Sequence, residues 1–112
     1  MPKPATRPLS HYSLEAAHLL GQLIRHARIA RKLTAAQLAE RAGLSRGLLQ
    51  RIERGDPGCA IGAVFEAAAI AGVPLFDADQ ATLDRAIAAN AATLTLMPKA
   101  VRAARTEVKD DF

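Results

Sequence analysis

The sequence is poor in cysteine, because Cys59 is the only one among its 112 residues. A single cysteine cannot form an intrachain disulfide, which favours a reducing compartment. No apolar run approaches the roughly 20 residues that a membrane-spanning helix needs. Residues 1–12 also lack the hydrophobic segment of a signal peptide. We therefore expect a cytoplasmic protein without a membrane segment.

Side chains that bind metals or carry catalysis are also sparse. His18 and His26 are eight residues apart, about two helical turns, which is too far to share an ion within one helix. Cys59 has no nearby base that could activate its thiol. Asp79 is better explained as a helix cap than as one of a catalytic carboxylate pair with Asp77. We expect no metal, no cofactor and no enzymatic activity.

Aromatic residues make up only 4% of the chain, whereas hydrophobic residues make up 50% and alanine is abundant. This composition favours helices that pack closely through small side chains. Residues 1–12 contain three prolines and are expected to form a flexible arm. Apolar spacing and capping residues then predict helices at residues 13–32, 35–42, 46–54, 60–71 and 79–92. The expected fold class is therefore all-α.

Particular residues mark the ends of the expected helices. Thr34, with Gln37 three residues later, predicts a capping box, and Gly43 predicts a left-handed helix end. Ser45 is expected to cap the third helix. The buried stripe of the fourth helix is expected to consist of Ile61, Val64, Phe65 and Ala68. Residues 93–97 could form a short strand, and residues 99–105 a sixth helix, or this end could be unstructured.

Positive charge is concentrated in one part of the chain. Residues 25–54 contain eight basic and two acidic residues, a net charge of +6. Residues 55–112 carry a net charge of −3, and the whole chain carries +4. A local basic block is expected of a protein that binds a polyanion such as DNA. A solvated helix surface is the alternative explanation.

The basic block contains two short helices joined by a glycine turn, with the series Leu-Thr…Gln-Leu-Ala…Ala-Gly-Leu-Ser…Glu-Arg-Gly over residues 33–55. A short turn sets a steep angle between such helices, so that the second can enter the major groove of DNA. The series resembles the helix-turn-helix of the phage-repressor and Cro (Xre-type) superfamily over residues 19–75. The resemblance implies a five-helix, lambda-repressor-like DNA-binding domain that binds a palindromic operator as a homodimer.

Carried over to this sequence, the resemblance implies base-reading roles for Arg46, Gln50 and Arg51. Arginine can bond guanine through two hydrogen bonds, and glutamine can bond adenine in the same way. The backbone contacts that it implies come from Ser45, Arg54 and Arg41. It also implies a structural ion pair between Arg28 and Glu53.

The sequence departs from the family pattern at three positions. Ala35 stands where a phosphate-binding glutamine is common, Gly47 offers no side chain for base reading, and Leu48 replaces a polar residue. These changes reduce the number of polar groups on the second helix. Specificity is therefore expected to depend on Arg46, Gln50 and Arg51.

The C-terminal part, residues 77–112, follows the DNA-binding domain expected at residues 13–76. Its apolar residues suit either a core or a homodimer interface: Leu83, Ile87, Leu94, Leu96, Met97 and Val101. Residues beyond Leu94 resemble the C-terminal region of HipB-like, Xre-type antitoxins that accompany HipA-like kinase toxins. This resemblance implies a toxin protein as partner and repression of the protein's own operon. The alternatives are a free-standing repressor and a protein-interaction module that has lost DNA binding.

Overall fold

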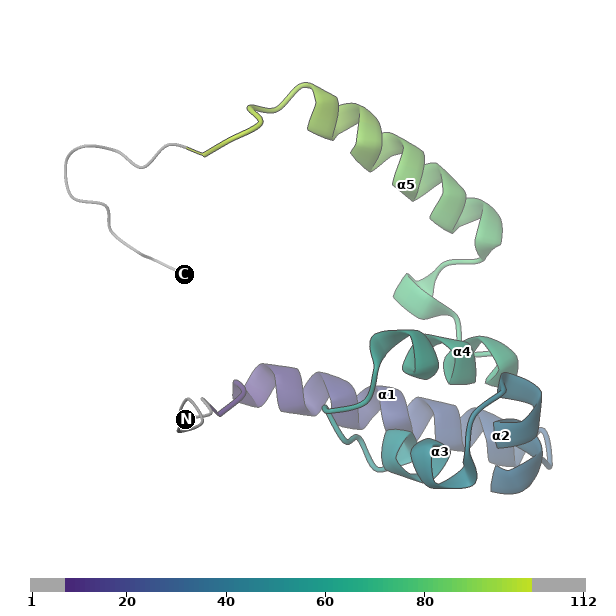
Figure 1. Ribbon diagram of the computed structural model, residues 1–112. Coiled ribbons are helices and arrows are strands. Elements are labelled where there is room, and N and C mark those ends of the chain that lie inside the picture. The colour runs from purple at the N-terminus through teal and green to yellow at the C-terminus, as the bar shows by residue number, and fades with distance from the viewer. Residues whose placement is uncertain (1–7, 102–112) are drawn as a thin grey trace. The chain divides into compact units, whose positions relative to one another are not determined.

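The computed structural model describes residues 8–101, and in this part of the chain all regular structure is helical (Figure 1). The elements are α1 (His11–Ala30), α2 (Ala35–Ala42), α3 (Arg46–Glu53), α4 (Ile61–Ala71), the short 3-10 helix η1 (Leu75–Asp77) and α5 (Gln80–Thr95). The chain divides into two compact units, one ending at Asp77 and the other beginning at Ala78. The expectation of an all-α fold is confirmed. No described helix is both long enough and apolar enough to cross a membrane.

Helix α1 begins two residues earlier than the sequence predicted. The backbone N–H of Ser13 donates to the side chain of Ser10 at 3.2 Å, so that Ser10 and not Ser13 caps the helix. His11 and Tyr12, which we expected in the arm, are therefore helical. The first seven residues of that arm lie outside the described part of the chain. At its other end α1 stops at Ala30, slightly before the expected end.

The capping signals around α2 and α3 are confirmed. Thr34 accepts a hydrogen bond from the backbone of Gln37 at 3.0 Å, and the Gln37 side chain accepts one from the backbone of Thr34 at 2.8 Å. Gly43 ends α2 in the left-handed conformation with a φ of 71°. Ser45 accepts from the backbone of Leu48 at 3.0 Å. Each cap satisfies a backbone group that has no partner within its helix, and so fixes where the helix begins or ends.

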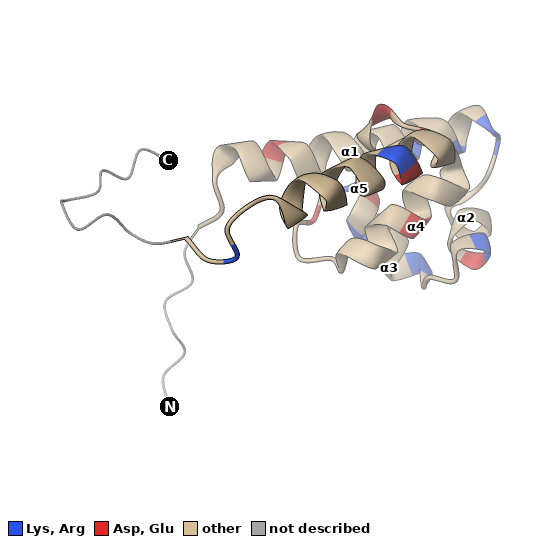
Figure 2. Cartoon of the chain, turned by 90° about the horizontal axis from the view of Figure 1, so that it is seen from above, with Lys and Arg blue, Asp and Glu red and all other residues tan. Residues whose placement is uncertain are grey.

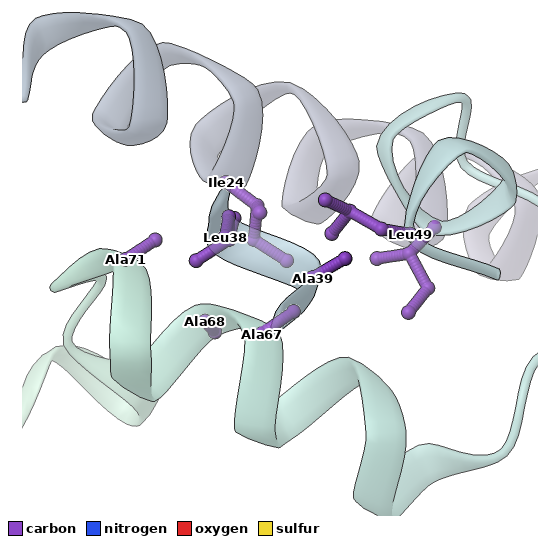
Figure 3. Close-up of a cluster of buried hydrophobic side chains, with 8 residues drawn as sticks. Ile24, Leu38, Ala39, Leu49, Ala67, Ala68 and Ala71 are labelled. Carbon is purple, nitrogen blue, oxygen red and sulfur yellow. The ribbon is translucent and has the colours of Figure 1, made fainter. Parts of the chain in front are cut away.

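The core of the first unit lies where α1, α2, α3 and α4 meet. Ile24, Leu38 and Leu49 are its largest fully buried side chains. Each such side chain stabilises the fold by about 1.5–3 kcal/mol through the apolar surface it removes from water. Around them lie the alanines Ala39, Ala67, Ala68 and Ala71 (Figure 3). The small alanines allow α2 and α4 to approach closely.

The buried face of α4 is only partly the predicted one. We expected Ile61, Val64, Phe65 and Ala68. Ala68 is buried, Val64 and Phe65 are half-buried, and Ile61 is 69% exposed. Ala67 and Ala71 take the remaining buried positions. An apolar stripe and an alanine stripe both fit this helix, and the packing against α2 selects the alanine stripe because it gives the closer contact.

The second unit contains α5, which begins after the expected cap at Asp79. The Asp79 carboxylate accepts from the backbone N–H of Thr82 at 2.8 Å. The hydrogen bond from the Thr82 side chain, and after it this backbone bond, lowers the pKa of Asp79. The helix continues to Thr95, so a strand from residue 93 is wrong. The prediction of a sixth helix over residues 99–105 is wrong for residues 99–101, which are not helical. Residues 102–105 lie outside the described part of the chain.

Candidate nucleic-acid interface

Helix α3 is held against α1 at two glycines. A Cβ atom on Gly21 would overlap the carbonyl oxygen of Ile52 and would lie 2.8 Å from that of Glu53. A Cβ atom on Gly55 would lie 2.7 Å from the Cα of His18. No larger residue fits at either position without moving a backbone, so these glycines set how closely α3 approaches α1.

A partly buried ion pair joins the same two helices. The Nε and Nη2 atoms of Arg28 donate to the two carboxylate oxygens of Glu53 at 2.7 and 2.9 Å. The side chains are 12% and 7% exposed. Arg28 also donates from Nη1 to the carbonyl oxygen of Leu33 at 2.9 Å, which ties the connection before α2 to the pair. The hydrogen bonds to Glu53 raise the pKa of Arg28, so the guanidinium stays charged.

Leu49 and Ile52 are the buried residues of α3, so the opposite face of this helix is exposed to solvent. Arg46, Gln50 and Arg54 follow each other at intervals of four residues and therefore share that exposed face. Arg51 is also exposed and neighbours this row. Figure 2 marks the basic residues of α1, α2 and α3. We call the exposed residues Arg46, Gly47, Gln50, Arg51 and Arg54 the α3 face.

One residue of the α3 face is already bound within the chain. The Nε atom of Arg51 donates to Oδ2 of Asp56 at 2.8 Å. We did not anticipate this ion pair from the sequence. An acidic residue five positions after an arginine, just past the glycine that ends a helix, is the signal that could have indicated it.

An open pocket of about 400 Å³ lies beside the α3 face. Its lining comes from α1, α2 and the end of α3: Arg25, Arg28, Ala35, Gln50, Glu53 and Arg54. Glu53 neutralises Arg28, and among residues 8–101 no carboxylate is within ion-pair distance of Arg25 or Arg54. The pocket therefore has an excess of positive charge, which suits an anion such as a phosphate group. Ala35, which replaces a longer polar residue of the family pattern, leaves this pocket open.

The remaining candidate residues, Ser45 and Arg41, are not part of the pocket lining. Ser45 precedes α3, and its hydroxyl oxygen accepts the helix-capping hydrogen bond. Arg41 is exposed in the last turn of α2 and is not part of the pocket lining. The structure thus brings Gln50 and Arg54 together around the pocket, and leaves Arg46 at the first turn of α3. In the described part of the chain no group of His, Cys, Asp or Glu residues could hold a metal ion.

A model of the helix-turn-helix domain family matches residues 19–86, which is more than half of the chain. The chain belongs to this family. The match begins in α1, covers α2, α3 and α4, and ends within α5. It agrees with the all-α, lambda-repressor-like fold that the sequence predicted. None of the curated proteins compared with the chain matches it.

Membership establishes this helix-turn-helix protein as a DNA-binding regulator. In such proteins the second helix of the motif enters the major groove, and the first crosses the DNA backbone. In this helix-turn-helix protein those helices are α3 and α2. The exposed basic face of α3 and the positively charged pocket next to it have the chemistry that this arrangement requires.

Proposed function

We propose that the protein is a sequence-specific transcriptional repressor that reads its operator with Arg46, Gln50 and Arg51. The observation that carries this proposal is the exposure of these three side chains on one helix whose position is fixed by the partly buried Arg28–Glu53 pair. Two arginines and a glutamine can each make paired hydrogen bonds to base edges in the major groove.

The contacts to the DNA backbone come, in this proposal, from Ser45, Arg54 and Arg41. Arg54 lines the positively charged pocket, where a phosphate oxygen would meet it together with Arg25. Ser45 lies at the N-terminus of α3, whose free backbone N–H groups favour an anion. Such contacts supply affinity and set the position of the protein on DNA, whereas the base contacts supply specificity.

We further propose that residues 77–112 form a homodimer interface, so that the protein binds a palindromic operator. Helix α5 buries none of its residues, and Ile87 and Leu94 are each 65% exposed. A 16-residue helix is marginally stable in water without packing partners, which favours association of this unit. A two-fold dimer requires operator half-sites about 34 Å apart.

The finer role that we propose is that of an antitoxin which represses its own operon in the cytoplasm and binds a HipA-like toxin through its C-terminal part. It rests on the resemblance of the residues beyond Leu94 to antitoxins. A kinase-like reading frame adjacent to this gene would support the role. Equal capture of the same partner by the intact chain and by a chain cut after Thr95 would contradict the role of the tail.

The proposed DNA contacts are tested by selecting binding sites from a random duplex library with the full chain. We expect Arg46→Ala to weaken binding to the selected site by about 1–3 kcal/mol and to relax the preference at one base pair. The matched control is Lys32→Gln, which removes one positive charge from an exposed residue outside the α3 face and outside residues 77–112. If Arg46→Ala binds the selected site as tightly as the control does, α3 does not read DNA as proposed. Failure to select any site would favour a protein-interaction module.

A further inference from the structure

Asp56 takes part in three hydrogen bonds in the turn that follows α3, and two of them join the turn to Arg51. The backbone N–H of Asp56 donates to the carbonyl oxygen of Arg51 at 3.0 Å. The Asp56 carboxylate accepts from Nε of Arg51 at Oδ2 and from the backbone N–H of Gly58 at Oδ1, both at 2.8 Å. Gly55, with a φ of 81°, directs the chain into this turn. The two oxygens of one carboxylate thus connect the arginine to the backbone of the turn.

This geometry restricts the arginine without using up its hydrogen-bonding capacity. A guanidinium group has five N–H donors, and the bond to Asp56 occupies only the one on Nε. The four donors on Nη1 and Nη2 remain for a base or a phosphate. The Asp56 carboxylate is itself fixed, because its other oxygen is bound to the backbone of Gly58. The hydrogen bond from Gly58 and the ion pair with Arg51 both lower the pKa of Asp56, which keeps it ionised at neutral pH.

We infer that Asp56 is a positioning residue that orients Arg51 and thereby determines specificity for the base pair that Arg51 contacts. The inference rests on the proposed base-reading role of Arg51. A long arginine side chain loses rotamer freedom when it binds, and a side chain that is already oriented loses less. A fixed fork of donors also fits the paired acceptors of guanine better than it fits other base edges.

The charge of Asp56 has a second effect, which gives the inference a distinctive signature. The carboxylate carries a negative charge on the side of the protein that approaches the phosphates, so it weakens binding to DNA of any sequence. Removing it should therefore strengthen nonspecific binding while weakening discrimination between base pairs. A residue that only stabilised the end of α3 would weaken specific and nonspecific binding together.

The test compares four proteins: wild type, Asp56→Asn, Arg51→Ala and the double variant. The site is first selected from a random duplex library with the wild-type chain. The base pair that Arg51 contacts is then identified as the one whose preference Arg51→Ala relaxes. For each protein, affinity is measured for the selected duplex, for the duplex changed at that pair, and for a duplex without the site. Asparagine has nearly the size of aspartate and keeps an acceptor for Gly58, so the turn should survive.

We expect Asp56→Asn to reduce discrimination at this pair about fivefold to tenfold, the effect of weakening one charge-assisted contact, and to raise affinity for the duplex without the site. In the Arg51→Ala background the same substitution should change discrimination by less than about twofold, since the pair is then already broken. If Asp56→Asn unfolds the chain, Asp56→Glu, which keeps the charge but moves it, should still reduce discrimination, while affinity for the duplex without the site stays unchanged.

Three outcomes would overturn the inference, and they differ in what they say of the proposed function. Unchanged discrimination in Asp56→Asn, with relaxed discrimination in Arg51→Ala, rejects the positioning role alone. Equal losses from Asp56→Asn with and without Arg51 show that Asp56 acts on the helix end and not through the arginine. If the wild-type chain selects no site, the proposed function fails, and the inference fails with it.

Discussion

Replacing Glu53 by alanine tests whether the partly buried ion pair holds α3 in place. In the folded protein Glu53 binds two nitrogens of Arg28 at 2.7 and 2.9 Å. The Arg28 side chain is only 12% exposed, so water cannot fully replace the lost carboxylate. Glu53→Ala would leave a charged guanidinium with one remaining partner, the carbonyl oxygen of Leu33.

The expected cost follows from this geometry. Removing one partner of a buried pair costs about 3–5 kcal/mol, because it leaves an uncompensated charge away from water. Domains of this size have total stabilities of about 5–15 kcal/mol. A loss of this size corresponds to a decrease in Tm of roughly 12–40 °C for a domain of 60–100 residues. The variant should therefore be much less stable than the wild type, although Glu53 does not contact DNA in our proposal.

The free energy of unfolding is measured by urea denaturation followed by circular dichroism, since the chain contains no tryptophan for fluorescence. Two further variants separate the causes. Glu53→Gln keeps an acceptor and should lose less stability than Glu53→Ala. In the double variant Arg28→Met/Glu53→Leu the stability should largely return, since replacing both charges by apolar side chains is often neutral or stabilising. A loss below about 1 kcal/mol for Glu53→Ala would refute the argument, because exposed pairs contribute that little.

Four further predictions concern stability. Gly21→Ala should destabilise the fold by about 1–3 kcal/mol in urea denaturation, because its Cβ overlaps the Ile52 carbonyl. Gly47→Ala, with open space around its Cβ, should instead stabilise it by about 0.5–1 kcal/mol. Thr34→Ala should cost about 1 kcal/mol in the same assay through loss of the capping box, and an unchanged value would contradict the role of this cap. Because folding lowers the pKa of Asp79, its capping contribution should be complete above the usual aspartate pKa and disappear as the pH falls through the lowered value. The NMR shift of the Asp79 carboxyl carbon should follow this titration, and a midpoint at or above the usual value would contradict it.

Local signals in the sequence predicted the helix-turn-helix well. Thr34, Gly43 and Ser45 act on backbone groups within four residues of themselves, so their effects do not depend on the rest of the fold. Leu49 and Ile52 are the buried residues of α3, and their spacing of three places them on one face of the helix. For these features, residue type and spacing already contain the physical cause.

Features that depend on contact between distant segments were predicted less well. The sequence of α4 offers two apolar stripes, and only the approach of α2 decides that Ala67 and Ala71 are buried and Ile61 is exposed. Hydrophobic spacing favours the larger side chains, whereas close packing of helices favours the smaller ones. The start of α1 was predicted two residues too late, because Ser10 and not Ser13 provides the capping hydroxyl.

The α3 face shows why residue types at motif positions do not by themselves give a recognition surface. Arg46 and Arg51 are the same residue type on the same helix, and the family pattern assigns both to base reading. In the structure Arg51 is bound to Asp56, whereas no described carboxylate lies within ion-pair distance of Arg46. A guanidinium held by a neighbouring carboxylate is restricted in direction, and a free one can turn to a base or a phosphate. Two arginines that the sequence makes equivalent should therefore differ in how strictly they discriminate between base pairs, and the difference comes from a residue outside the helix.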